Sequence, residues 1–146
     1  MKLAKALKVK NKLAGEISQA QKLIEAANVV EGSNARPHDV RKIYSDMVFN
    51  QEMLAELKGR ISAANVPIAR RIFMMSELKG RIAFLRGMST KDGEFMVEGR
   101  YGTDTKFREY RAELTAAWVE EQVRAMSAEI ERLQDEIEEH NALTEV

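Results

Sequence analysis

Apolar residues recur along most of this chain at alternating spacings of three and four, which places them on one side of an α-helix. The longest unbroken run extends from Val40 to Ala64 and contains one polar member, Asn50. The spacing predicts helices over roughly 2–29, 38–64 and 67–87, and a fourth that begins after Thr115. We therefore expect a mainly α protein, an antiparallel helical bundle or coiled coil of about four helices.

The helical pattern stops between the third and fourth helices. Two short mixed segments, 94–98 and 107–114, flank the turn-forming stretch 99–104. Clustered turn residues between short apolar segments are typical of a β-hairpin. We predict a single helical domain over 1–146 with a small hairpin insert at about 93–114. An isolated hairpin is marginally stable in water, so it should lean on the helices or pair with another subunit.

Several features predict self-association. An Asn within an apolar helical seam usually fixes register or oligomer state. Charge is also divided, because residues 58–111 hold 12 basic and 6 acidic groups whereas 112–146 hold 2 and 10. The candidate oligomer and register residues are Asn50, Val119, Val123, Met126, Ile130, Leu133 and Ile137.

Composition excludes several classes of chemistry. The chain has no Cys, so it has no disulfide, thiolate nucleophile or Cys-based zinc site. Its two histidines lack metal-ligand spacing, and no P-loop, dinucleotide fingerprint or nucleophile elbow occurs. No apolar run reaches the length of a membrane span, and the N-terminus lacks a signal-peptide core. We expect a cytoplasmic protein that is not an enzyme and needs no metal or cofactor.

Positive charge in the middle of the chain predicts a ligand site. Arginine presents a planar fork that suits phosphate, and aromatic rings offer flat surfaces for a base. The alternative is that these aromatic residues simply pack on the helices. The candidate ligand-binding residues are Arg70, Arg71, Lys79, Arg81, Arg100, Tyr101, Arg108, Tyr110 and Arg111.

Three functions follow in order of preference. The first is a non-enzymatic, oligomeric helical protein that acts by binding. The second is an oligomeric sponge that sequesters small phosphorylated or nucleotide signalling ligands at subunit interfaces, by analogy with phage anti-defence proteins. The third is a nucleic-acid-associated protein. It ranks last because the net charge is zero and no helix-turn-helix or known RNA-binding module is present.

A short internal repeat joins the second and third predicted helices. Residues 56–61 read Glu-Leu-Lys-Gly-Arg-Ile, and residues 77–82 repeat the same six letters three heptads later. Two copies do not make a solenoid. Either the repeat is a coincidence in helices rich in Lys and Glu, or the glycines at 59 and 80 permit close helix approach beside Arg60 and Arg81.

The two ends and three internal stretches also resemble a known family. The matching stretches are 1–7, the set Leu57, Ile61 and Asn65, the pair Arg100 and Tyr101, 107–114, and the ending 130–141. Together they resemble a family of small, uncharacterised bacterial helical proteins, some of which are labelled septicolysin. The chain departs from the family pattern at Ser62, where the family has Asn, and at Ala142, where it has Trp. The resemblance implies a helical, oligomeric protein and supplies no catalytic residues.

Overall fold

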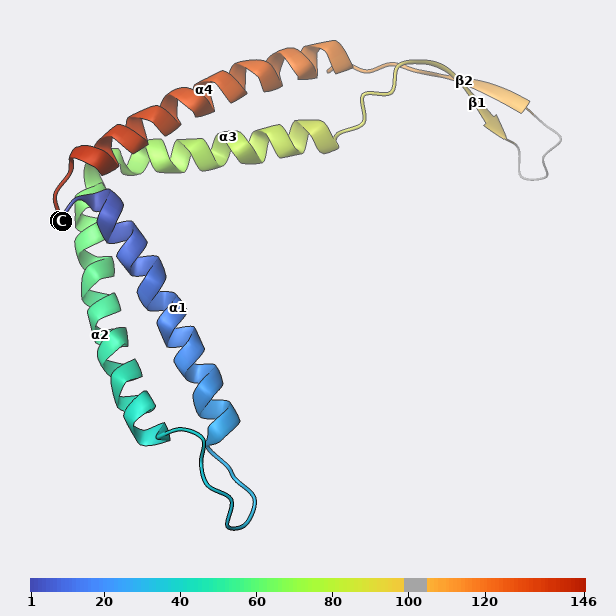
Figure 1. The fold of residues 1–146 in the computed structure, drawn as a ribbon. Coiled ribbons are helices and arrows are strands. Elements are labelled where there is room, and N and C mark those ends of the chain that lie inside the picture. Colours follow the sequence, from blue (N-terminus) through green and yellow to red (C-terminus); the bar gives the residue numbers. More distant parts are fainter. Residues whose placement is uncertain (99–104) are drawn as a thin grey trace. The chain divides into compact units, whose positions relative to one another are not determined.

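The computed structural model describes residues 1–98 and 105–146. Its elements in chain order are α1 (Leu3–Ala27), α2 (Val40–Asn65), the 3-10 turn η1 (Val66–Ile68), α3 (Ala69–Gly87), β1 (Gly93–Glu98), β2 (Thr105–Tyr110) and α4 (Ala116–Leu143) (Figure 1). The prediction of a mainly helical chain with a small hairpin between its third and fourth helices is confirmed.

The start of the last helix follows the predicted cap. The backbone N–H of Trp118 donates to the Thr115 hydroxyl oxygen at 3.2 Å. This bond satisfies one of the first-turn amides that have no intrahelical acceptor. The second helix begins at Val40, two residues after the predicted start at 38, and Asp39 is its N-cap. The Asp39 carboxylate accepts from the Lys42 amide at 3.1 Å.

Two helix ends also depart from the sequence pattern. The first helix ends at Ala27, two residues before the predicted end at 29, and the Arg36 guanidinium donates to the carbonyls of Ala27 and Asn28. The residue before a proline usually avoids helical dihedrals. Val66 nonetheless adopts φ −51° and ψ −44°, and its amide donates to the Ala63 carbonyl. Its helical conformation is therefore supported by a backbone hydrogen bond.

The chain divides into two compact units. The first comprises Met1–Ala69 and Ile137–Val146, and the second comprises Arg70–Glu136. Helix α4 contributes residues to both. The single domain expected over 1–146 and the four-helix bundle both stay predictions, since the contacts pair the helices two by two.

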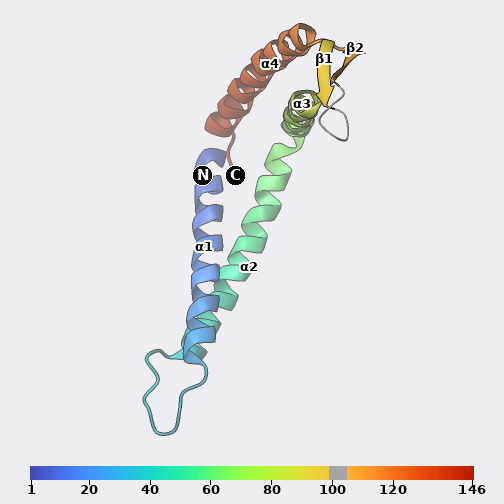
Figure 2. The same cartoon turned by 90° about the vertical axis from the view of Figure 1, so that its right-hand side faces the viewer.

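The first unit is built on the antiparallel pair α1 and α2, which run side by side in Figures 1 and 2. Near the start of α1, Leu3 packs with Ile61 of α2. Near its other end, Ile17 packs with Met47. Burial of each such side chain contributes about 1.5–3 kcal/mol. The predicted register residue Asn50 is half-buried on α2, between Met47 and Leu54 along the chain.

The end of the chain closes this unit against its start. Lys2 pairs with Glu145 in an isolated antiparallel bridge. The Leu3 amide donates to the Thr144 carbonyl at 2.8 Å, and the Lys2 ammonium lies 2.7 Å from the Glu145 carboxylate. The last residues are therefore anchored to the first turn of α1 by backbone and side-chain bonds together.

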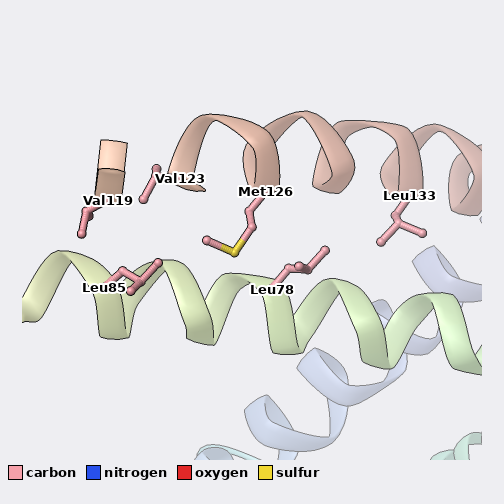
Figure 3. Close-up of a cluster of buried hydrophobic side chains, with 6 residues drawn as sticks. All are labelled: Leu78, Leu85, Val119, Val123, Met126 and Leu133. Atoms are coloured by element: carbon pink, nitrogen blue, oxygen red, sulfur yellow. The ribbon is translucent and has the colours of Figure 1, made fainter. Parts of the chain in front are cut away.

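The second unit is built on α3 and α4, whose apolar side chains meet in one seam (Figure 3). Leu78 and Leu85 of α3 face four residues of α4, and Ile130 packs against the same cluster. Those four are Val119, Val123, Met126 and Leu133. The seam assigned from sequence to self-association is thus occupied by α3 of the same chain. Ile137, the last member of that set, is buried within the first unit.

Within the described ranges 1–98 and 105–146, no helix combines the length and the apolar character needed to cross a bilayer.

Candidate binding surface on the hairpin

The hairpin carries the densest group of predicted ligand residues. Strands β1 and β2 pair antiparallel, with Gly93 opposite Tyr110 and Glu98 opposite Thr105. At the base, the Ala112 amide donates to the Asp92 carboxylate at 3.3 Å. Gly93 has φ +103°, a conformation that side chains disfavour, so a glycine is needed where β1 begins.

Side chains alternate between the two faces of the hairpin, because successive strand residues point to opposite sides. Tyr110, Arg108 and Lys106 of β2 share one face with Phe95 and Val97 of β1. We call this the basic face. It unites two predicted ligand residues, Arg108 and Tyr110, from a single strand.

Lys91 adds a third cation to the basic face. Its ammonium nitrogen lies 4.4 Å from the ring centroid of Phe95 and 4.2 Å from that of Tyr110. The two rings meet edge to face, with centroids 5.8 Å apart and planes at 71°. A cation over an aromatic ring is stabilised by about 0.5–1 kcal/mol at exposed sites. The contact therefore holds one positive charge directly over the aromatic pair.

The basic face has the chemistry of an anion-binding surface. Lys91, Lys106 and Arg108 bring three positive charges, and no carboxylate lies on this face among the side chains that the structure describes. Arg108 stands directly opposite Phe95. A guanidinium beside a ring can hold a phosphate while the ring contacts a flat group.

The opposite face of the hairpin has a different character, and we call it the acidic face. Met96 stands opposite Phe107, with 64% and 68% of their surfaces exposed. Glu94 stands directly opposite Glu109, and like charges in that position destabilise a strand pair. This face is both apolar and negatively charged. Phe107 therefore points to the opposite side of the hairpin from Tyr110.

The four candidates on α3 do not form one site. Arg71 pairs with Glu136 of α4, and Glu136 also accepts from Arg132. Arg132 in turn bonds Glu129, which lowers the pKa of that carboxyl and raises the pKa of the guanidinium. Arg71 thus belongs to an ion-pair network that joins α3 to α4.

The remaining candidates are dispersed. Helical spacing places Arg70 and Arg81 on the same side of α3, and Lys79 on the other side of the core seam. Arg111 is exposed just beyond the end of β2. Arg100 and Tyr101 lie outside the described residues.

Three members of the basic face were missed as ligand residues in the sequence: Lys91, Phe95 and Lys106. The alternation of charge and aromatic character within Thr105–Tyr110 contains the signal for Lys106, since residues two apart share a face. The partners from β1 and the preceding loop depend on the strand register. That register is set by the pairing across the turn.

A second hollow lies in the first unit. A cavity of about 470 Å³, open to solvent, is lined by Ile24, Asn28, Val40, Arg41 and Tyr44. It sits where α1 ends and α2 begins. Its size falls in the range of small-molecule sites. None of its lining residues is among the predicted ligand residues, because the closeness of the two helix ends is a tertiary property.

Metal binding finds no support in residues 1–98 and 105–146, where no group of three or more potential ligands is close enough to hold an ion. His140 instead contacts the Ala64 carbonyl and Thr144.

Comparison with protein-family models, with curated proteins and with solved structures produced no match for this chain.

Proposed function

We propose that this chain is a non-enzymatic cytoplasmic protein that self-associates and acts by binding. The observation that carries the proposal is the exposure of large apolar residues on two helices, Phe49 of α2 and Phe73 and Phe84 of α3. These rings are 63%, 69% and 66% exposed, so the described residues around them cover each ring only in part. Exposed apolar patches on a soluble chain typically mark interaction surfaces.

Self-association also supports the fold expected from the sequence. Two two-helix layers that pack face to face make a four-helix bundle, the architecture that the heptad pattern predicts. The oligomeric character implied by the resemblance to the septicolysin-labelled family points the same way. We therefore propose that the bundle forms when equivalent layers of different copies meet.

The deciding measurement is the mass of the purified chain in solution. Light scattering coupled to size exclusion, run from about 1 to 100 µM, should give at least twice the mass of 16.6 kDa at the upper concentrations. A mass of one chain throughout this range would contradict the proposal.

A second candidate function is favoured by the basic face of the hairpin. We propose that a small phosphorylated or nucleotide ligand binds there, with its phosphate at Arg108 and its base beside Phe95 and Tyr110. The arrangement of Lys91 over both rings supports this assignment, because it keeps charge and flat apolar surface together.

The ligand hypothesis is tested by thermal shift with a panel of nucleotides, including cyclic ones. A bound nucleotide should raise the melting temperature as its concentration passes Kd, following RT ln(1 + [L]/Kd). Arg108→Ala should abolish the shift. Lys58→Ala, which removes an exposed cation from α2, is the matched control and should preserve it.

Two other outcomes would redirect the assignment. A shift that persists in Arg108→Ala but disappears in Arg41→Ala would place the ligand in the cavity between α1 and α2. Binding of nucleic acid that weakens steeply with salt would favour the third candidate, a nucleic-acid-associated protein.

A further inference from the structure

Helix α3 has a second side that its own unit leaves uncovered. Its core side packs on α4 through Leu78 and Leu85. Beside that seam, Phe73, Met74 and Phe84 have 69%, 40% and 66% of their surfaces exposed. At 100° per residue, these three residues lie within about 100° of one another around the helix, so they share one side. The exposed side therefore has an apolar group near each end of α3.

Charges on this side of α3 have a specific order. Glu77 and Arg81 lie between Met74 and Phe84, on the same side of α3. Both are exposed, and neither has an ion-pair partner among the described residues. Arg70, also exposed on this side, precedes Phe73, so this side reads positive, apolar, negative, positive, apolar along the helix.

We propose that this stripe, Phe73, Met74, Glu77, Arg81 and Phe84, binds the same stripe of a second copy in antiparallel orientation. The inference rests on the proposed self-association and names the surface responsible for it. A two-fold axis near residue 79 places Glu77 opposite Arg81 of the second copy, and the reverse pair forms by symmetry. The same axis places Met74 opposite Phe84 of the second copy.

Orientation follows from the charges. In an antiparallel pair, each carboxylate meets a guanidinium and each apolar end meets an apolar end. In a parallel pair in register, Glu77 would face Glu77 and Arg81 would face Arg81, so both contacts would be repulsive. The stripe is complementary to itself only when reversed.

The sequence repeat provides an internal comparison. In α2, Met53, Glu56 and Arg60 occupy the positions that correspond to Met74, Glu77 and Arg81, and all are exposed. The position that corresponds to Phe84 holds Ala63, however, and the position that corresponds to Phe73 holds Glu52. The α2 stripe does carry one exposed ring, Phe49, one turn before Met53, but it has none beyond Arg60. A reversed pair of α2 stripes would set Met53 opposite Ala63 where α3 sets Met74 opposite Phe84, so we assign the contact to α3.

The test reverses the charge of one residue in α3 and, separately, of the equivalent residue in α2. Glu77→Arg places two repulsive contacts at the α3 interface and should raise the dimer dissociation constant about tenfold or more, as measured by sedimentation equilibrium. Glu56→Arg makes the same change within the same local sequence of α2. It should change the constant by less than about twofold, because the α2 stripe lies outside the proposed contact.

The double variant Glu77→Arg/Arg81→Glu should restore association, since it re-creates opposite charges across the two-fold axis. Failure of that rescue, an unaffected Glu77→Arg variant, or equal weakening by Glu56→Arg would each overturn the assignment to α3. Circular dichroism of every variant checks that the helices remain folded.

The same measurements distinguish failure of the proposed self-association from failure of the α3 stripe alone. A wild-type chain that stays monomeric at all concentrations would overturn both proposals, whereas a dimer indifferent to Glu77→Arg would overturn only the surface. A third outcome would assign the stripe to lipid. The wild type would then stay monomeric and sediment with anionic lipid vesicles, and Phe84→Glu would abolish that sedimentation. This result would likewise overturn the inference.

Discussion

The imidazole Nε2 of His140 lies 3.0 Å from the backbone carbonyl oxygen of Ala64, so the last turn of α4 is bonded to the end of α2. Thr144 hydroxyl lies 3.2 Å from the other ring nitrogen. With the proton on Nε2, the ring donates to the carbonyl while Nδ1 accepts from the hydroxyl. His140 is thereby a structural residue of the first unit.

Replacing this histidine tests that role. His140→Ala should lower the free energy of unfolding by about 1–3 kcal/mol, because it leaves the Ala64 carbonyl without its partner. Urea denaturation followed by circular dichroism measures the change. His38→Ala removes the other histidine, which is exposed, and should leave stability within about 0.5 kcal/mol.

Low pH should weaken the contact between the first and last residues of the chain in the first unit. Hydrogen bonds from the Lys2 ammonium and the N-terminal ammonium lower the pKa of Glu145 from its ordinary 4.5. A carboxyl with a lowered folded pKa stabilises the fold when ionised, and that stabilisation is lost as pH falls below 4.5 through the folded value. Wild type should therefore melt above Glu145→Gln at neutral pH, and the two should converge in acid. A difference in melting temperature that persists unchanged at pH 2 would contradict this.

Shortening a buried side chain of the α3–α4 seam should lower the free energy of unfolding strongly. Leu78 is 4% exposed and contacts residues of α4 (Figure 3). Leu78→Ala should cost about 2–5 kcal/mol through lost burial and the cavity left behind. Phe84→Ala, on the exposed side of the same helix, should cost less than 1 kcal/mol in the monomeric chain. Denaturation at low protein concentration separates the two.

The repeated glycines provide a test of close helix approach. A Cβ at Gly59 or Gly80 would meet no atom within 4 Å. Each change to Ala should therefore stabilise its helix by about 1 kcal/mol through higher helix propensity. Thermal melting of Gly59→Ala and Gly80→Ala measures this gain. A loss of stability or of self-association in either variant would mean that another helix approaches that glycine closely.

Much of the fold follows from local sequence. The cap at Thr115 and the glycine at 93 act through the residues beside them, and the structure contains both features. The apolar pattern predicts a start at 38, whereas the structure begins the helix after Asp39, a strong capping residue. Apolar spacing alone does not fix such a boundary to the residue, because the cap is a separate local hydrogen bond.

The candidate site was recovered only in part. Arg108 and Tyr110 were selected by residue type and do share a face, because both belong to one strand. Arg71 was selected for the same reason, but Glu136 engages it from α4. Residue type indicates what a side chain can bind. It does not indicate whether a distant part of the chain already occupies that side chain.

The sequence by itself determined the helices, the hairpin between α3 and α4, and the apolar stripes, because these depend on interactions between residues a few positions apart. Tertiary structure decided which stripes meet. It packed Val119 against the α3 seam, and it set Lys91 over Phe95 and Tyr110. Both outcomes depend on contacts between segments that are distant in the chain. Helical or strand periodicity determines on which side of its element a residue lies. It does not determine which other segment packs against that side.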